Sequence, residues 1–252
     1  MGRMSSPDAP RKAPPERRVQ AMFDDIVERY DLVNGLLSLG LDGGWRRAAI
    51  RAVHLEPGDR ALDLGCGTGD LTLGTLRTSP WSLATGVDIS HAMLSAARRR
   101  AETDANGASA SFVRGSAFRL PFRDGAFAGA VSGFVLRNLD DLPGAFAELA
   151  RVIRPGGRIG LIDVTEPRIR ALRTLFDAYF RVAAPALGAM VGKRDAYRYL
   201  ARSLAQLPSP ERVSGMLDEA GFDRAAARPL TGGMVTLFTG VRRRGSPVGA
   251  DR

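Results

Sequence analysis

The chain has 252 residues, 44% of them hydrophobic, and a formal net charge of +9 at pH 7. This length suits one large α/β domain or two small ones, and no apolar run reaches the roughly 18 residues of a membrane-spanning helix. The single cysteine excludes an internal disulfide and fits a reducing cytoplasm. The positive charge suggests nucleic acid or anionic lipid as a partner, but few aromatic residues accompany the arginine clusters, so charge alone decides neither.

The N-terminal part predicts a leader followed by helices. Residues 1–16 are rich in Pro, Arg and Ser and lack the apolar centre of a secretory signal, so we expect a disordered leader. Apolar residues at three- and four-residue spacing predict a helix over about 16–30, and a further helix is expected to end near Val53.

From residue 60 onward, predicted strands and helices alternate. Strands are expected at about 60–64, 82–87, 112–115, 126–134 and 158–164, and helices at 70–78, 90–103 and 142–153. A turn is expected at 154–157. This alternation predicts an α/β fold with a parallel sheet, helices on both faces and a ligand site at the carboxyl ends of the strands.

The C-terminal part departs from this alternation. Residues 167–207 have a helical pattern whose apolar face either packs on the sheet or forms a wall for an apolar substrate or a membrane-facing patch. A helix at 210–220 and two closing strands at 222–229 and 231–240 follow, and the tail from Arg242 onward is expected to be disordered.

A glycine-rich turn follows the first predicted strand. Gly65, Gly67 and Gly69 have no Cβ, so the backbone of this turn can approach a ligand closely. The dinucleotide fingerprint requires glycine at its sixth position, where this chain has Asp70, and an oxidoreductase is therefore disfavoured. The pattern GxGxG, with Asp63 two residues before it, resembles motif I of class I S-adenosylmethionine (SAM) methyltransferases.

Asp88 ends the second predicted strand, about 20 residues past the glycine turn, where a ribose-binding carboxylate is expected. The structural alternative is a strand-end aspartate that caps a helix beginning near Ser90. Because both halves of the pattern are present, we favour SAM as the cofactor. Cys66 lies within the turn, and without a Cys/His pair it is interpreted as a small filler rather than a catalytic thiol.

Several further motifs together resemble one family, the ubiquinone/menaquinone biosynthesis C-methyltransferases. The resemblance covers about Arg18 to Gly240. The motifs that carry it are Tyr30-Asp31-Leu32-Val33-Asn34, Trp45-Arg46-Arg47, the glycine turn, Leu120-Pro121-Phe122, Leu136-Arg137-Asn138, Arg154-Pro155-Gly156-Gly157 and Tyr197-Arg198-Tyr199-Leu200.

This resemblance implies a Rossmann-like class I methyltransferase fold, with a mostly parallel seven-stranded sheet and helices on both faces. It also implies one domain over residues 17–241 after the leader at 1–16, with lid helices at 17–55, a helical substrate-side insertion at 166–208 and a basic tail at 242–252.

The resemblance further implies methyl transfer from SAM to a ring carbon of a polyprenylated quinol, with demethylmenaquinol preferred to the ubiquinone precursor. No metal is needed. A cytoplasmic protein is expected, and peripheral contact with the inner face of the membrane and a homodimer are compatible with it; nucleic acid is not expected as a partner. The rival interpretations are a methyltransferase of a soluble aromatic metabolite and a nucleic-acid methyltransferase, whose Asn-Pro-Pro-Tyr-type motifs are absent.

Carried over residue by residue, the family's pattern predicts SAM contacts at four positions and acceptor contacts at four others. The SAM contacts are Thr68, Asp88, Ser116 and Ala117, and the acceptor contacts are Arg137, Asn138, Tyr30 and Asp31. Arg137 would favour the quinol anion, Asn138 and Tyr30 would orient the ring, and Asp31 is a candidate base. The structural alternatives are that Arg137 caps the preceding strand and Tyr30 ends a helix against the core. His54 and His91 are expected to serve structure.

The chain departs from the family's pattern beside the acceptor motif. The family usually reads Ser-Phe-Gly before Leu-Arg-Asn, whereas this chain has Gly133-Phe134-Val135. Asp42 stands where the family often has histidine, and Gly35 where it has Asp or Ser. The Val135 side chain is expected to narrow its surroundings, and these changes concern the acceptor rather than SAM.

Overall fold

The computed structural model describes residues 40–167 and 207–244, together with the single residues 20, 21, 24, 27, 35, 38, 173 and 174. Several expectations lie outside the described residues: the leader, Tyr30, Asp31, the helical pattern over 168–206 and residues 245–252 of the tail. The first predicted helix is described only at residues 20, 21, 24 and 27.

Strands and helices alternate from residue 60 to residue 164, as the sequence predicts. The elements are α3 (Asp42–Val53), β1 (Arg60–Leu64), α4 (Asp70–Thr78), β2 (Leu83–Asp88), α5 (His91–Thr103), η2 (Gly107–Ser109), β3 (Ala110–Arg114), β4 (Phe127–Gly133), η3 (Leu136–Asn138), α6 (Leu142–Val152), β5 (Ile153–Val164), α9 (Pro210–Glu219), β6 (Phe222–Leu230), η4 (Thr231–Gly233) and β7 (Val235–Arg242).

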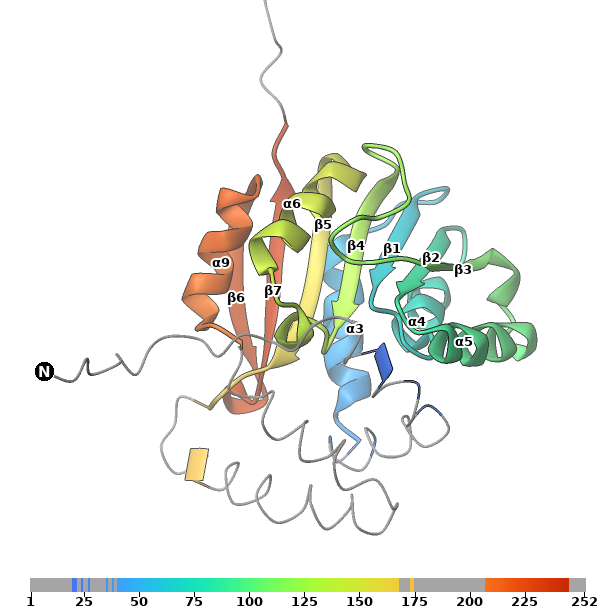
Figure 1. The fold of residues 1–252 in the computed structure, drawn as a ribbon, viewed down its shortest axis with the longest axis horizontal. Coiled ribbons are helices and arrows are strands. Elements are labelled where there is room, and N and C mark those ends of the chain that lie inside the picture. Colours follow the sequence, from blue (N-terminus) through green and yellow to red (C-terminus); the bar gives the residue numbers. More distant parts are fainter. Residues whose placement is uncertain are drawn as a thin grey trace, which may run out of the picture.

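The strands form one seven-stranded sheet in the order β3-β2-β1-β4-β5-β7-β6 (Figure 1). β3, β2, β1, β4 and β5 are parallel neighbours, and β7 is antiparallel to both β5 and β6. β4, at the centre, is buried at six of its seven residues, as expected for a parallel strand covered on both faces. The predicted mostly parallel α/β sheet is therefore confirmed.

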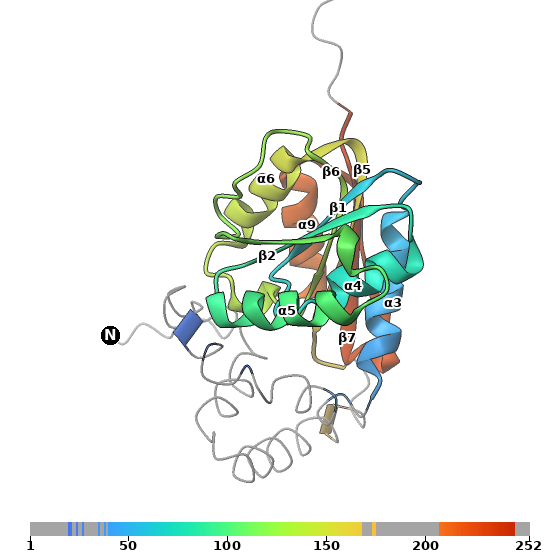
Figure 2. The ribbon, with the colours of Figure 1, turned by 90° about the vertical axis from the view of Figure 1, so that its right-hand side faces the viewer.

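Helices cover both faces of the sheet (Figures 1 and 2). α6 and α9 bury Phe146, Leu149 and Leu217 against one face, in a cluster that includes Leu62 of β1 and Phe238 of β7. α3 packs on the other face against β4, β5 and β7, and α4 lies beside it. The reversal of strand order between β1 and β4 places a cleft at their carboxyl ends, where ligands bind in sheets of this kind.

The helix starts follow the sequence closely. Ser90 caps α5 by accepting a hydrogen bond from the Met93 amide at 3.0 Å, and Asp141 caps α6 by accepting one from the Gly144 amide at 3.0 Å. α9 begins with Pro210 after the cap Ser209, in the position where a missing N–H costs nothing.

Four boundaries differ from the prediction by two or more residues. β3 begins at Ala110 rather than at about 112. β5 begins at Ile153 and includes the predicted turn at 154–157, because Ile153 pairs with Phe127 before a register shift in β4. β7 begins only at Val235, since a 3₁₀ turn occupies residues 231–233. The strand also extends to Arg242, one residue into the predicted tail, because Arg242 pairs with Phe222 and its Nε donates to the Ala150 carbonyl at 2.6 Å.

Candidate active site

A cleft lies at the carboxyl ends of β1, β2 and β4. The space between its lining atoms, including the part open to solvent, is about 730 Å³. Its lining residues are Leu64, Gly65, Gly67, Val87, Asp88, Ile89, Met93, Gly115, Ala117, Phe118, Phe134, Val135, Asn138, Leu139 and Asp140. Most are apolar or glycine, so a few polar groups determine how a ligand is oriented.

The glycine loop between β1 and α4 forms one wall of the cleft. Gly65, Gly67 and Gly69 have φ of +66°, +53° and +88°, in the left-handed region that favours glycine. The loop is closed by a hydrogen bond of 2.9 Å from the Gly69 amide to the Cys66 carbonyl. Bare backbone therefore faces the cleft at Gly65 and Gly67.

Asp88 lies at the end of β2 and is fixed by two backbone amides. The Gly67 amide donates to Oδ2 and the Ser90 amide donates to Oδ1, both at 2.9 Å. Burial raises the pKa of this carboxyl, and the amides of Ser90 and Gly67 counteract that rise. Each oxygen still has a lone pair, so the carboxylate can accept hydrogen bonds from a ligand diol.

Asp63 is buried beneath the loop rather than in the cleft. The Thr72 hydroxyl donates to its Oδ2 at 2.7 Å, and Oδ1 has no hydrogen-bond partner among the described residues. Burial raises the pKa of Asp63 to about 7, and the Thr72 hydrogen bond and the charge of Arg46 partly offset this effect. Asp63 thus supports the junction of β1 and α4 from below.

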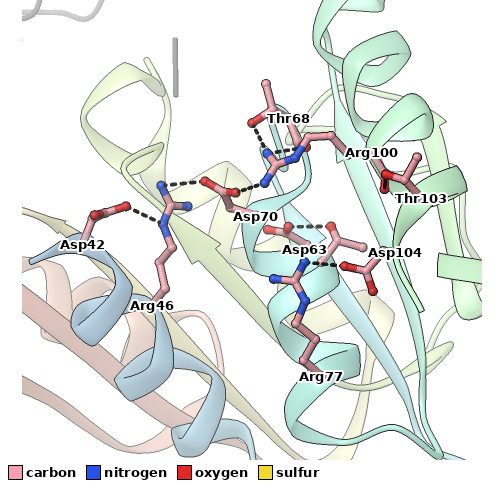
Figure 3. Close-up of polar contacts among 10 residues, drawn as sticks. Asp42, Arg46, Asp63, Thr68, Asp70, Arg77, Arg100, Thr103 and Asp104 are labelled. Atoms are coloured by element: carbon pink, nitrogen blue, oxygen red, sulfur yellow. Dashed lines mark hydrogen bonds and ion pairs between the residues drawn. The ribbon is translucent and has the colours of Figure 1, made fainter. Parts of the chain in front are cut away.

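The other predicted SAM contacts occupy different environments. Ala117 lines the cleft beside Phe118, whereas the Ser116 hydroxyl accepts a hydrogen bond from the Phe118 amide at 3.2 Å. Thr68 is buried outside the cleft lining, and its hydroxyl accepts a hydrogen bond from Arg100 at 3.0 Å (Figure 3). These contacts stabilise the loop and the turn after β3.

The predicted acceptor residues Arg137 and Asn138 lie on η3, directly after β4. Both the backbone amide and the guanidinium of Arg137 bind the carboxylate of Asp163 on β5, and the two side chains are almost fully buried. Asn138 lines the cleft, and its side-chain amide donates to the Phe134 carbonyl at 3.4 Å. The predicted partners Tyr30 and Asp31 lie outside the described residues.

Of the two residues here that depart from the family's pattern, Val135 lines the cleft and Gly133 does not. A Cβ added to Gly65 would lie 2.4 Å from Cγ2 of Val135, so the Val135 side chain rests on the glycine loop. A Cβ added to Gly133 would lie 2.9 Å from Cδ1 of Leu71. The neighbouring Ser132 is not a lining residue, and its hydroxyl donates to the Leu64 carbonyl at 2.7 Å.

The groups considered as alternative nucleophiles or bases are placed unfavourably. Cys66 is buried, and burial raises the pKa of its thiol, so that the unreactive protonated form dominates. His54 and His91 are exposed, at the end of α3 and the start of α5. Within the part of the chain that the structure describes, no cluster of His, Cys, Asp and Glu could hold a metal.

Sequence reasoning did not identify every residue around the cleft. It missed the lining residues Ile89, Met93, Leu139 and Asp140, and it missed Asp163 as the partner of Arg137. The position of Asp163 near the end of a predicted strand adjoining the site is the one signal that could have revealed it.

The cleft suits a nucleoside with a polar extension. Ala117 and Phe118 form apolar walls, the Asp88 carboxylate can accept further hydrogen bonds, and the backbone at Gly65 and Gly67 carries no side chain. These features match what SAM presents.

Comparison with known families and proteins supports this assignment. Residues 12–242 match the sequence profile of the ubiE/COQ5 methyltransferase family. A demethylmenaquinone methyltransferase of Thermus thermophilus is 39% identical over 222 residues, which are 88% of this chain and 100% of that protein. A protein of Geobacter sulfurreducens named ubiquinone/menaquinone biosynthesis C-methyltransferase UbiE is 34% identical over 224 residues, 88% of each chain.

Solved structures share the fold at lower identity. A SAM-dependent methyltransferase from Thermotoga maritima has a TM-score of 0.60 at 19% identity, covering 89% of this chain and 99% of that one. The [4+2]-cyclase SpnF has a TM-score of 0.61 at 19% identity, covering 94% and 100%. Because a cyclase and a methyltransferase match equally well, this likeness shows the fold alone. Among the described helices, none has the length and apolar character needed to span a membrane.

Proposed function

The chain belongs to the ubiE/COQ5 methyltransferase family, and we propose that it methylates a ring carbon of demethylmenaquinol with SAM as the methyl donor. As a member of this family it is a SAM-dependent methyltransferase of quinone biosynthesis. The identity of the acceptor's headgroup is proposed here and does not follow from the family alone. The names of the relatives at 36% and 39% identity, both demethylmenaquinone methyltransferases, favour the naphthoquinol over the ubiquinone precursor.

The observation that carries the donor side is the link between Gly67 and Asp88. The Gly67 amide and Asp88 are joined by a 2.9 Å hydrogen bond, so the glycine loop and the end of β2 form one rigid edge of the cleft. In this proposal Asp88 binds both ribose hydroxyls, Ala117 and Phe118 enclose the adenine, and the loop holds the methionine end. Bound SAM supplies an electrophilic methyl group on a sulfonium.

On the acceptor side, Asn138 of η3 lines the cleft, and Arg137 precedes it in the chain and is paired with Asp163. The charge of Arg137 favours ionisation of a ring hydroxyl, which makes the adjacent ring carbon nucleophilic. Asn138 and Tyr30 orient the ring, and Asp31 is proposed to take the ring proton after the carbon–carbon bond forms. Holding the two reactants in line supplies much of the rate acceleration.

The quinol's prenyl tail has consequences for location and partners. We propose a cytoplasmic protein that contacts the inner face of the membrane peripherally when it collects its substrate. The net charge of +9 supports attraction to anionic lipid, and a homodimer is compatible with the proposal.

The experiment is a methyl-transfer assay with labelled SAM and reduced acceptors. Demethylmenaquinol, a demethylated ubiquinone precursor and a soluble short-chain naphthoquinol are offered separately to wild type and to Asp88→Ala. Asp140→Ala is the matched control, since Asp140 also lines the cleft but does not bind the glycine loop in the contacts described above.

Label in demethylmenaquinol that is lost in Asp88→Ala and kept in Asp140→Ala would support the proposal. Label only in the ubiquinone precursor would replace the proposed naphthoquinol headgroup with that of the ubiquinone precursor. SAM binding without transfer to any quinol would leave the family assignment intact and reject the proposed acceptor.

A further inference from the structure

Arg46 of α3 contacts Asp42 on its own helix and two separate segments beside the cleft. Its Nε is 3.3 Å from Oδ2 of Asp42, its Nη2 is 3.2 Å from Oδ2 of Asp70, and its guanidinium carbon is 5.7 Å from the centre of the Phe134 ring. The side chain is only 16% exposed, so screening by water weakens these contacts less than it would at the surface. Figure 3 shows Arg46 reaching from α3 between the two carboxylates.

One branch of these contacts leads to the glycine loop. Asp70 is the first residue of α4, directly after the loop, and its Oδ1 is 2.5 Å from Nη2 of Arg100 on α5. Nη1 of Arg100 donates to the carbonyl and the hydroxyl of Thr68 at 3.1 and 3.0 Å. Arginines from two helices therefore hold one carboxylate, and this chain of contacts ends on the loop itself (Figure 3).

The other branch leads to the end of β4. Phe134 lines the cleft with φ of +63°, a conformation that is unfavourable for a bulky residue and persists only where the surroundings impose it. Its ring centre lies 6.2 Å from that of Trp45 and within 6 Å of the guanidinium groups of Arg46 and Arg137. Contacts from α3 thus help to hold the strained residue that precedes η3.

We propose that Arg46 is a positioning residue that joins the two halves of the cleft, holding the glycine loop through Asp70 and the end of β4 through Phe134. The inference rests on the proposed function, because the first half binds the methyl donor there and the second half faces the acceptor. A small displacement of either half moves the sulfonium and the ring carbon out of line, and a misplacement of about 1 Å can lower a rate about 100-fold.

The test compares Arg46→Met with Arg47→Met. Both changes remove one guanidinium from α3, but Arg47 is exposed. We expect Arg46→Met to weaken SAM binding about 3- to 10-fold and to lower kcat about 10- to 100-fold, whereas Arg47→Met leaves both unchanged. Arg46→Lys should recover part of the SAM affinity, because an ammonium can pair with Asp70 but cannot reproduce the planar contacts.

Two further variants separate the branches. Asp70→Asn should weaken SAM binding with little change in kcat at saturating SAM, and Phe134→Leu should lower kcat while SAM affinity is kept. In the double variant Arg46→Met/Asp70→Asn, SAM affinity should be no lower than in Asp70→Asn alone, because both changes break the same link.

A binding readout keeps this test independent of the acceptor's identity. The chain has two tryptophans, and Trp81 is 78% exposed, so Trp81→Phe leaves Trp45 as the single reporter beside Phe134. SAM should change Trp45 fluorescence in this background, and Arg46→Met should remove the change.

If no quinol is methylated, the proposed acceptor fails while this readout still tests Arg46. The inference would be overturned if Arg46→Met had the same SAM affinity, kcat and Trp45 fluorescence response as Arg47→Met, even if its melting temperature were lower.

Discussion

The side chain of Val135 lies directly over the Cα of Gly65. A Cβ added to Gly65 would be 2.4 Å from Cγ2 and 2.9 Å from Cγ1 of Val135, distances at which one of the two residues must move. Gly65 also has φ of +66°. Glycine is therefore required at this position for two independent reasons, steric contact and backbone conformation.

These two reasons can be separated by mutation. We expect Gly65→Ala to destabilise the fold by about 1–3 kcal/mol from overpacking, in addition to roughly 1 kcal/mol from the left-handed backbone. Gly58→Ala is the matched control, since Gly58 has φ of +83° and nothing within 4 Å of an added Cβ. Val135→Gly should recover the overpacking part in the double variant. Urea unfolding measures each value, and a double variant as unstable as Gly65→Ala would contradict the steric contact.

Cys66 fills space between the glycine loop and β2. Its Sγ would lie 2.8 Å from a Cβ added to Gly86, and burial is the main cause that raises the thiol pKa. We expect Cys66→Ala to retain kcat and to cost about 1 kcal/mol in unfolding free energy for the lost sulfur. Iodoacetamide should modify the folded protein far more slowly than the urea-unfolded chain. A variant that binds SAM but transfers no methyl group would show instead that the thiol takes part in the reaction.

Asp63 should make stability depend on pH. Its pKa rises from 3.8 to about 7 in the folded protein because of burial, so the folded state keeps a proton that the unfolded state loses. The stabilisation that this bound proton adds to the unfolding free energy is therefore fully present below about pH 4. It is lost as pH rises to about 7, a change on the order of 4 kcal/mol.

The comparison is with Asp63→Asn, which cannot ionise. Between pH 4 and pH 7 the unfolding free energy of wild type should fall relative to that of the variant. The neighbouring Asp88, whose pKa is also raised, is present in both proteins, and its charge is a smaller cause of the raised Asp63 pKa than burial. Parallel stability curves over this range would mean that Asp63 ionises normally.

The sequence was sufficient for the sheet and for bringing the glycine turn and Asp88 to one cleft. Regular alternation located the first five strands, and two closing strands were expected after the alternation ended. The spacing between the glycine turn and Asp88 brought both to one cleft, but the 2.9 Å hydrogen bond between Gly67 and Asp88 was not foreseen. These features are encoded locally, in hydrophobic period and in glycine position.

Contacts between distant segments were not predictable in this way. Arg46 and Asp70 are separated in the chain by more than half of α3 and all of β1, and Arg137 and Asp163 by α6 and most of β5. Whether an arginine faces solvent or a buried carboxylate depends on packing that no local pattern encodes. The sequence indicated that the Val135 side chain narrows the space around it. For the same reason, it could not indicate that Gly65 is the residue against which Val135 packs.

Arg137 combines a structural and a proposed catalytic task, and mutations can separate them. It is paired with Asp163, which is fully buried and also accepts a hydrogen bond from the Arg137 amide at 3.0 Å. Arg137→Met leaves that carboxylate without its counter-charge, which should cost roughly 3–5 kcal/mol. Asp163→Asn in the same chain removes the buried charge, so the double variant should be more stable than Arg137→Met alone.

Arg137→Lys keeps the counter-charge and is therefore the variant that tests catalysis. We expect urea unfolding to show a loss of no more than about 2 kcal/mol, while kcat falls at least 10-fold, because an ammonium bound to Asp163 cannot also reach a ring oxygen with the fixed fork of a guanidinium. SAM affinity, measured by calorimetry, should be unchanged because Asp88 and the glycine loop are untouched. If the lysine variant keeps its kcat, Arg137 serves only as the partner of Asp163, and ionisation of the quinol must depend on another residue.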